Sequence, residues 1–324
     1  MEVPDLGLGG TPRQHRLGSR LSSPVAADDR IGALARCSLN QATIKHASLA
    51  EAVAVTAAAG YGAIGLWRDR VQETGAAQAG RIVAEAGLRV STLCRGGFLT
   101  AADPAGVQAA LADNELAIAE AATVGARELV FVVGGLPAIS EPGGPARPDA
   151  SGADRDLGAA RQRVADRLAD LVPVAQAHGV RIALEPMHPL FTADRGVIAT
   201  LAQALDLAAP FPASAVGVVV DTYHVWWDPE LEASIARAGR EDRLASYQIC
   251  DWILPLAADS LHSRGQVGDG YVDFATVTRW VAATGYAGDI ETEIFNEAIW
   301  ADDPTVTAAT VAARYLSHVH PHLS

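Results

Sequence analysis

Four oxygen-bearing side chains each end a hydrophobic run in the second half of the chain. They are Glu185, Asp221, Gln248 and Glu293. Each run has the composition of a buried strand, and the C-terminal tip of a strand is the usual site position in a (β/α)8 barrel. Three carboxylates and one amide oxygen form a set of hard oxygen donors, which suits Mn²⁺ or Mg²⁺. The pattern therefore predicts an enzyme that holds a divalent metal with these four residues.

Strand and helix patterns alternate from about residue 34 onward, which predicts a parallel sheet. Eight strand–helix pairs predict closure into one (β/α)8 TIM barrel. Each gap between consecutive candidate ligands is roughly one strand–helix unit of about 30 residues with loop extensions. Strands five to eight should therefore place the four side chains at one mouth. The expected strands are 34–39, 63–67, 89–94, 128–133, 181–185, 216–221, 244–248 and 289–293. The expected helices are 49–59, 76–86, 105–123, 158–178, 197–208, 229–238, 274–284 and 304–318.

The barrel is expected to occupy residues 31–324, because no linker separates a second domain. Residues 1–30 are rich in Gly, Pro, Ser and Arg and lack the basic-then-apolar order of a signal peptide. They are predicted to form a flexible arm. Residues 136–155 are rich in Gly and Pro and too polar for a regular element, so a lid or an oligomer contact is expected there.

The bulk composition argues against several classes of function. The net charge is −13, so the chain is a poor partner for nucleic acid, which proteins bind by neutralising phosphates with Lys and Arg. No apolar stretch approaches the ~20 residues of a membrane span. Three cysteines in or beside apolar runs fit reduced thiols and a cytoplasmic location. Lys45 is the only lysine and lies in a predicted loop, which disfavours Schiff-base chemistry.

Five short motifs surround the candidate ligands. They are Ala183-Leu-Glu-Pro186, Val220-Asp-Thr-Tyr-His224, Gln248-Ile-Cys-Asp251, Arg264-Gly-Gln-Val-Gly-Asp-Gly270 and Glu293-Ile-Phe295. As a set they resemble motifs of the xylose-isomerase-like TIM-barrel superfamily, particularly its sugar-phosphate isomerases and ketose 3-epimerases. The resemblance covers nearly all of the chain from about residue 34 and implies that Glu185, Asp221 and Glu293 are metal ligands. In the 3-epimerases the third ligand is usually histidine, and here it is Gln248, whose neutral amide oxygen shifts the preference further toward Mn²⁺ or Mg²⁺.

A divalent metal that binds two neighbouring sugar oxygens polarises the carbonyl and stabilises the enediolate formed when the adjacent C–H loses its proton. The resemblance implies that Glu185 and Glu293 move that proton. We therefore expect a metal-dependent sugar isomerase or epimerase with Mn²⁺ (or Mg²⁺) as cofactor. Its ligand is expected to be a small sugar or glycoside.

Five more residues are expected at the site. The resemblance implies that His224 contacts substrate oxygens and that Arg264 orients a substrate hydroxyl, and a bidentate arginine would also suit a phosphate. His188, three residues after Glu185, is an alternative general base by its position. Trp67 and Trp252 lie at predicted strand ends, where they would pack on the sugar or seal the barrel mouth.

Two alternatives to an isomerase use the same parts. The first is a lyase that expels a group β to a carbonyl. Inosose-type dehydratases and the catalytic subunits of C-glycoside deglycosidases resemble this barrel, and the latter act with a small partner subunit. The second is a degenerate barrel that only binds a sugar or a protein. A homo-oligomer and a small partner subunit are both compatible with the sequence. Asp251 could replace Gln248 as a ligand, but strand alternation places it on the opposite face.

Overall fold

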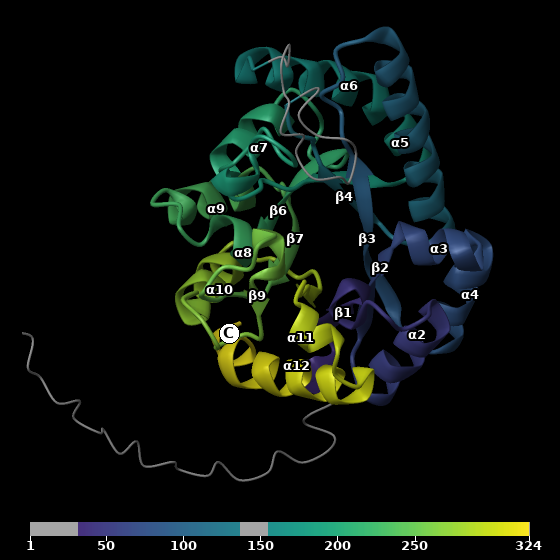
Figure 1. Ribbon diagram of the computed structural model, residues 1–324, viewed down its shortest axis with the longest axis vertical. Helices are drawn as coiled ribbons and strands as arrows, with labels where there is room; N and C mark the ends of the chain where they lie inside the picture. The colour runs from purple at the N-terminus through teal and green to yellow at the C-terminus, as the bar shows by residue number, and fades with distance from the viewer. Residues whose placement is uncertain (1–31, 137–154, 324) are drawn as a thin grey trace, which may run out of the picture.

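Eight parallel strands close into a ring in the order β1-β10-β7-β6-β5-β4-β3-β2. Helices cover the outside of this ring in the computed structural model (Figure 1). Because both faces of each strand are buried, the strands are apolar along most of their length. The predicted (β/α)8 TIM barrel is confirmed. The barrel strands are β1 (Cys37–Asn40), β2 (Ala63–Trp67), β3 (Arg89–Gly97), β4 (Glu128–Val132), β5 (Arg181–Leu184), β6 (Val216–Asp221), β7 (Leu244–Ile249) and β10 (Ile290–Thr292).

The structure describes residues 32–136 and 155–323. The predicted arm, residues 1–30, lies outside this part of the chain. The predicted lid, residues 136–155, also lies outside it except for its two end residues. None of the helices within the described residues has the length and apolar character needed to cross a bilayer.

The helices begin at polar caps, and several end where glycine lets the chain turn back. Ser48 and Glu51 form a reciprocal capping box at the start of α2. Gly125 and Gly179 end α5 and α6 in the left-handed conformation that glycine adopts most easily. The helices are α2 (Leu49–Ala58), α3 (Arg68–Thr74), α4 (Ala76–Glu85), α5 (Pro104–Val124), α6 (Leu157–His178), α7 (Leu201–Ala208), α8 (Thr222–Val225), α9 (Leu231–Arg240), α10 (Phe274–Ala283), α11 (Glu297–Trp300) and α12 (Pro304–His318).

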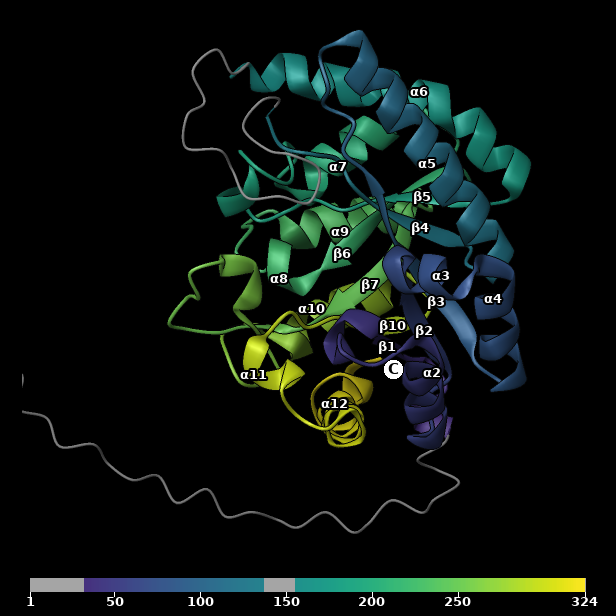
Figure 2. The same ribbon diagram turned by 45° about the vertical axis from the view of Figure 1, so that its right-hand side comes forward.

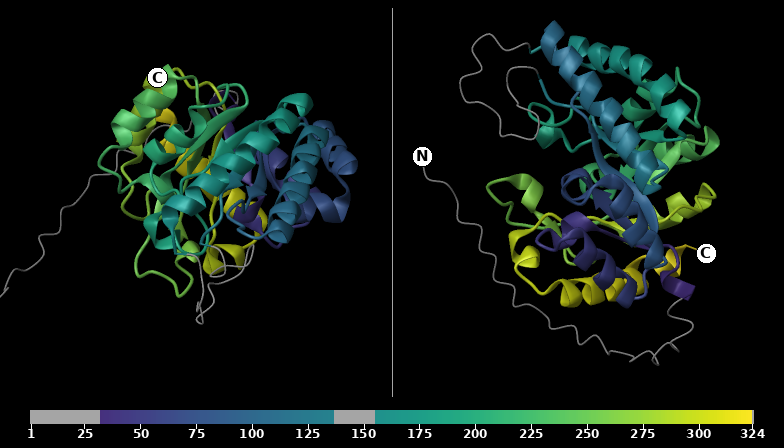
Figure 3. Two further views of the ribbon diagram at one scale, coloured as in Figure 1. Left: turned by 90° about the horizontal axis from the view of Figure 1, so that it is seen from above. Right: turned by 90° about the vertical axis from the view of Figure 1, so that its right-hand side faces the viewer.

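Long helices pack side by side around the ring. Helices α5 and α6 lie against each other, as Figure 2 shows. The last helix, α12, packs beside α2 and so brings the end of the described chain next to its beginning (Figure 3). The main hydrophobic core lies between these helices and the strands. A smaller apolar cluster fills part of the barrel interior, and it consists of Cys94, Val130, Ala183, Val219 and Ala245.

Three details differ from the expected elements. The first strand begins at Cys37 rather than at residue 34, because residues 32–34 form a helical turn and Arg36 donates hydrogen bonds to carbonyl oxygens before β10. Strands β5 and β10 end one residue before Glu185 and Glu293. A short antiparallel hairpin follows β7, and the sequence analysis did not anticipate it. Its strands are β8 (Asp251–Trp252) and β9 (Arg264–Gly265).

Candidate metal centre and substrate cavity

The strand register places three polar side chains in one row across neighbouring strands. Asp221 on β6 pairs with Gln248 on β7, and Gln248 pairs in turn with Glu291 on β10. Glu185 and Glu293 follow directly after β5 and β10, so they lie at the C-terminal mouth of the barrel. At most 4% of each of these five residues is exposed. The structure therefore brings the four predicted ligands to one mouth and adds Glu291.

One arginine reaches the acidic cluster formed by Glu185, Asp221 and Glu293. Arg264 lies on β9, and the β8–β9 hairpin carries it to the cluster. Its Nη1 lies 2.9 Å from Asp221 Oδ2 and 3.1 Å from Glu293 Oε2. Three ionised carboxylates and one guanidinium leave two negative charges uncompensated. One divalent cation carries the charge that would balance them.

Burial and mutual repulsion raise the pKa values of the acidic cluster. Burial, followed by the charges of Asp221 and Glu293, raises the pKa of Glu185 well above its usual range. Burial also raises the pKa of Asp221 against the opposing charge of Arg264. Burial raises the pKa of Glu293 to about 7. A bound cation would remove the penalty for ionising these groups, so the cluster is suited to hold one.

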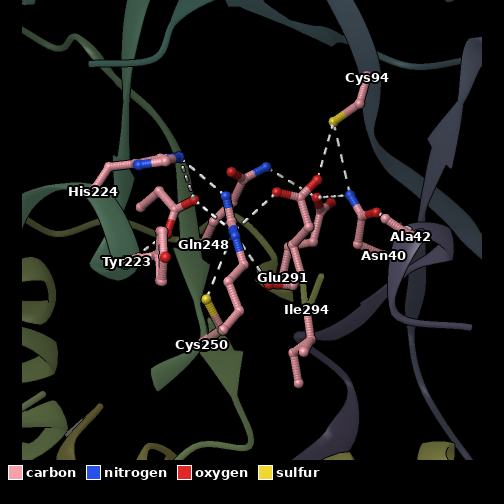
Figure 4. A network of polar contacts seen from close by, with 12 residues as sticks. Asn40, Ala42, Cys94, Tyr223, His224, Gln248, Cys250, Glu291 and Ile294 are labelled. Atoms are coloured by element: carbon pink, nitrogen blue, oxygen red, sulfur yellow. Dashed lines mark hydrogen bonds and ion pairs between the residues drawn. The ribbon is translucent and has the colours of Figure 1, made fainter. Parts of the chain in front are cut away.

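Glu291 fixes the orientation of the Gln248 amide. Gln248 Nε2 donates to Glu291 Oε1 at 3.0 Å. Rotating the amide by half a turn would set its oxygen against the Glu291 carboxylate, so the nitrogen must face Glu291. Figure 4 shows the amide nitrogen of Gln248 on the side of Glu291 and the amide oxygen turned away from it. The oxygen is therefore the atom that Gln248 offers to a metal.

Glu291 is itself held by donors from two further strands, β1 and β3. Asn40 Nδ2 donates to Oε1 at 2.7 Å, Thr92 Oγ1 lies 2.9 Å from Oε2, and Ser91 Oγ also donates to Oε2. Gly65 leaves the space for this carboxylate, because a Cβ there would lie 2.6 Å from the Glu291 carboxyl group. The sequence did carry a signal for Glu291, since strand alternation places it on the same face as Glu293.

Two buried oxygens of the site have no hydrogen-bond partner among the described residues. They are Glu185 Oε1 and Gln248 Oε1. Buried polar atoms normally find a partner, and both atoms are hard oxygen donors of the kind that Mn²⁺ and Mg²⁺ prefer. The two unpaired oxygens and the two uncompensated charges fit a divalent cation held by Glu185, Asp221, Gln248 and Glu293.

His224 lies beside this cluster, and two donors face its ring. The backbone N–H of His188 donates to Nδ1 at 3.1 Å, and Arg264 Nη2 lies 3.0 Å from Nε2. Burial, followed by the charge of Arg264, lowers the pKa of His224 well below its usual range, so the ring is neutral. A neutral imidazole has only one acceptor nitrogen. With Nδ1 accepting from His188, the proton of the neutral ring is on Nε2. His224, Glu185 and Asp221 offer ligand atoms that lie within 4.8 Å of one another, and Nε2 would bind a metal only in the other tautomer.

Arg264 and His224 present N–H groups at the cavity. Arg264 Nη2 lies 3.0 Å from His224 Nε2, which also lies 3.8 Å from Asp221 Oδ2, and Arg264 Nε has no hydrogen-bond partner among the described residues. Both residues line the same cavity. An oxygen atom of a bound ligand placed between them would accept from both. The predicted contacts of His224 and Arg264 with substrate oxygens are therefore consistent with their positions.

The cavity beside the acidic cluster has a volume of about 420 Å³. Glu185 and Glu293 lie in its wall, and an aromatic side is formed by Trp67, Phe98 and Phe295. Trp67 thus lies where the sequence predicted, and its Nε1 donates to Asn40 Oδ1 at 2.8 Å. A larger cavity, of about 950 Å³, is lined by residues at the N-terminal ends of the strands. TIM barrels place their chemistry at the other end.

His188 and Trp252 are not among the residues that line this cavity. The two rings pack on each other with centroids 4.6 Å apart, and Trp252 also stacks on Tyr223 at 4.8 Å. Burial lowers the pKa of His188 to about 4. What His188 provides is its backbone N–H, which sets the tautomer of His224. The predicted roles of His188 as a base and of Trp252 as a substrate contact stay predictions.

Asp251 faces away from the cluster, as strand alternation predicts. Its Oδ2 accepts from the backbone N–H groups of Gly268 and Gly270, and its Oδ1 accepts from that of Val272. The glycine-rich turn is therefore built around Asp251. The N–H groups that might have held a phosphate in this turn are already bonded to a carboxylate.

Replacing Gln248 by histidine should preserve metal binding. The imidazole can donate one N–H to Glu291 and direct its other nitrogen at the metal, which is a common arrangement at zinc sites. Because imidazole suits zinc better than an amide oxygen does, the Zn²⁺ to Mg²⁺ affinity ratio should rise. Calorimetric titration of Zn²⁺ and Mg²⁺ into the unaltered protein and into Gln248→His measures this ratio. Gln248→Leu is the matched control and should weaken both metals. Unchanged metal affinity in Gln248→Leu would remove Gln248 from the ligand set.

Metal binding should release protons near neutral pH. The folded-state pKa of Glu293 is about 7, above its ordinary value of 4.5, so below pH 7 a cation must displace a proton and Mn²⁺ affinity should fall. In the metal-free protein the folded state holds this proton more tightly than the unfolded state, so stability should fall as pH rises from 4.5 to 7. Calorimetry in two buffers of different ionisation enthalpy counts the protons, and equal heats in both would contradict the expectation.

Proteins of known structure share this fold. A protein from Sinorhizobium meliloti 1021 has 41% sequence identity with the chain and a TM-score of 0.79, covering 87% of this chain and 98% of that one. The IolI protein, solved with a bound zinc atom, has 18% sequence identity and a TM-score of 0.73, and the match covers 89% of this chain and 99% of IolI. The E. coli 3-keto-D-glucoside 4-epimerase has 21% sequence identity and a TM-score of 0.66, and the match covers 86% of this chain and 97% of the epimerase.

No curated protein matches the chain. The family model described as xylose isomerase-like TIM barrel matches residues 53–319, which is most of the chain and includes every candidate ligand. The resemblance that the five motifs indicated is confirmed over this range. The chain belongs to the xylose isomerase-like TIM barrel family.

Proposed function

We propose that this protein is a divalent-metal-dependent sugar isomerase or epimerase. The observation that carries the proposal is the buried acidic cluster at the barrel mouth, where Arg264 balances one of three carboxylate charges, beside a cavity of about 420 Å³. The sugar-epimerase name of the E. coli neighbour and the zinc atom bound to IolI support it. Mn²⁺ or Mg²⁺ is the proposed metal, because all four donors are oxygens.

The metal would be held by Glu185, Asp221, Gln248 and Glu293. When bound, it supplies Lewis-acid polarisation of a substrate carbonyl, which makes the neighbouring C–H more acidic. Glu291 and its donors keep the Gln248 oxygen turned toward the site. The carboxylate of Asp221 is aligned by the backbone N–H of Tyr223, at 2.8 Å, and by Arg264. These residues fix the geometry before substrate arrives, which is the condition for electrostatic catalysis.

Two residues are assigned to the proton transfer. Glu185 and Glu293 follow β5 and β10, which are separated in the ring by β6 and β7, so they approach the cavity from different sides. Both carboxylates line the cavity, and a carboxylate within reach of the substrate can serve as general base or general acid. We assign the two transfers, removal and return of the proton, to Glu293 and Glu185. His224 and Arg264 donate to the substrate oxygen on which negative charge develops.

A lyase on an oxidised glycoside is a second candidate. The aromatic side of the cavity favours it, because Trp67 and Phe295 meet edge to face at 5.5 Å and Phe98 lies in the same wall. Flat aromatic surfaces can pack on the leaving group of a glycoside as well as on a sugar ring. The same base would remove the proton, and the group β to the carbonyl would leave with the electron pair.

Proton exchange with solvent tests both candidates in one assay. The Mn²⁺-loaded protein is incubated in D₂O with free ketoses and with 3-keto-D-glucosides, and proton NMR follows the C–H next to the carbonyl. An isomerase or epimerase should incorporate deuterium and produce the isomeric sugar. A lyase should instead release the aglycone and form an unsaturated ketone. No exchange and no elimination with any member of the panel would count against a proton-transfer enzyme.

A further inference from the structure

The cavity carries an arginine, Arg95, that no carboxylate of the described residues contacts. Arg95 lies in the cavity wall, and its guanidinium packs over the Phe98 ring with the carbon 4.2 Å from the ring centroid. Within residues 32–136 and 155–323, no side chain pairs with it by a hydrogen bond or an ion pair. Other arginines near the barrel mouth do have such partners. Arg68, for example, contacts both Asp113 and Glu120.

The environment of Arg95 makes an unpaired charge costly. Burial, followed by the neighbouring charges of Arg195 and Arg68, lowers its pKa to about 10, so it remains charged at neutral pH. A partly buried cation normally has a counter-ion. In a chain with a net charge of −13, an unpaired arginine facing a cavity is a specific feature rather than a general excess of positive charge.

Besides Arg264, which contacts the acidic cluster, Lys45 and Arg195 line the same cavity. Lys45 Nζ lies 4.1 Å from the centroid of the Trp300 ring. Arg195 is held in place by Asp259, whose Oδ2 lies 2.9 Å from its Nη2. The charge of Arg195 is already balanced. Neither Arg95 nor Lys45 has a carboxylate partner among the described residues, and of these two Arg95 is the more buried, since Lys45 is exposed.

We infer that the substrate of this cavity carries an anionic group, a carboxylate or a phosphate, and that Arg95 binds it. The inference deepens the proposed function and rests on it only for the cavity's role as the substrate site. A planar guanidinium pairs with either group through two parallel hydrogen bonds. The substrate would be a keto sugar acid or a sugar phosphate, with its carbonyl toward Glu293 and its anionic end toward Arg95. The Phe98 ring holds the guanidinium from behind, which limits the conformational freedom lost on binding.

Binding of three small probes tests this inference without turnover. Calorimetry measures the affinity of the Mn²⁺-loaded protein for D-fructose, 2-keto-D-gluconate and D-fructose 6-phosphate. The same titrations are repeated with the metal-free protein, because the two anionic probes can also bind Mn²⁺ directly. At least one anionic probe should bind about tenfold or more tightly than D-fructose. Preference for the carboxylate identifies a sugar acid, and preference for the phosphate identifies a sugar phosphate.

Arg95→Met is the decisive variant, because methionine keeps the packing on Phe98 and removes the charge. It should lose the preference for the anionic probe and leave D-fructose binding nearly unchanged. Arg279→Met removes an exposed arginine of α10 and should keep the preference. An anion preference retained in Arg95→Met, or equal binding of neutral and anionic probes to the unaltered protein, would overturn the inference. Proton exchange on neutral ketoses without any anion preference would leave the proposed function standing and remove the subsite alone.

Discussion

Replacing Glu293 by glutamine should abolish proton exchange while leaving the barrel folded. Glutamine has nearly the same shape but cannot take up a proton, and general acid–base catalysis contributes roughly 10²–10⁴-fold. We expect a loss of at least about a thousandfold, because the variant also removes one charge from the proposed metal site. Glu185→Gln should have an effect of similar size. The measurement is deuterium incorporation in D₂O at saturating Mn²⁺, with circular dichroism to show that the fold is kept.

The matched control for both variants is Glu115→Gln, which makes the same substitution at an exposed position of α5. It should exchange protons at the rate of the unaltered protein. Exchange at an undiminished rate in Glu293→Gln would remove this residue from the proton transfer. A loss of exchange together with unfolding would instead show that the residue supports the fold.

Replacing Glu291 by glutamine should weaken Mn²⁺ binding by about 10–100-fold, which is typical when the partner of a metal ligand is removed. The carboxylate accepts from Gln248, Asn40 and Thr92 in a fully buried setting. A glutamine in its place can turn its own NH₂ toward Gln248, which would then rotate and present its NH₂ to the metal. Unfolding should also become easier by about 2–4 kcal/mol, because buried donors lose a charged acceptor. Calorimetric titration with Mn²⁺ and thermal unfolding measure the two effects.

A double variant distinguishes loss of the Gln248 orientation from general destabilisation of the site. Glu291→Gln combined with Gln248→Glu keeps the total charge and exchanges donor for acceptor, so the glutamine at 291 donates to a carboxylate at 248. That carboxylate again presents an oxygen to the metal, and Mn²⁺ affinity should recover at least in part. Affinity that is unchanged in the single variant would show that Glu291 does not orient Gln248. A double variant no better than the single one would assign Glu291 a purely structural role.

The barrel and the ligand positions could be read from the sequence because they depend on local patterns. Buried parallel strands are apolar runs, and the glycines after helices mark where the next strand begins. A polar residue at the end of such a run stands out against its neighbours, as Asp221 does after five residues of β6 that are valine or glycine. Eight repeats of the strand–helix unit then bring the C-terminal ends of all strands to one mouth of the barrel, because parallel strands point in the same direction.

The environment of each site residue could not be read in this way, since it depends on residues far apart in the chain. Gln248 offers its oxygen because Glu291 accepts from its nitrogen, and Glu291 is held in turn by Asn40 and by residues of β3. Arg264 reaches the acidic cluster only because a hairpin folds it back after β7. Position alone made His188 a candidate base, yet its ring packs on Trp252.

What the sequence by itself determined is the ring of eight strands, and it predicted a set of candidate oxygen ligands at the mouth of that ring. The tertiary structure decided which atom of Gln248 faces the site, which tautomer His224 adopts and which arginine of the cavity has no carboxylate partner among the described residues. The physical reason lies in the range of the interactions. Strand and helix patterns follow from neighbours along the chain, whereas hydrogen-bond direction and charge balance are set by groups that meet only when the barrel closes.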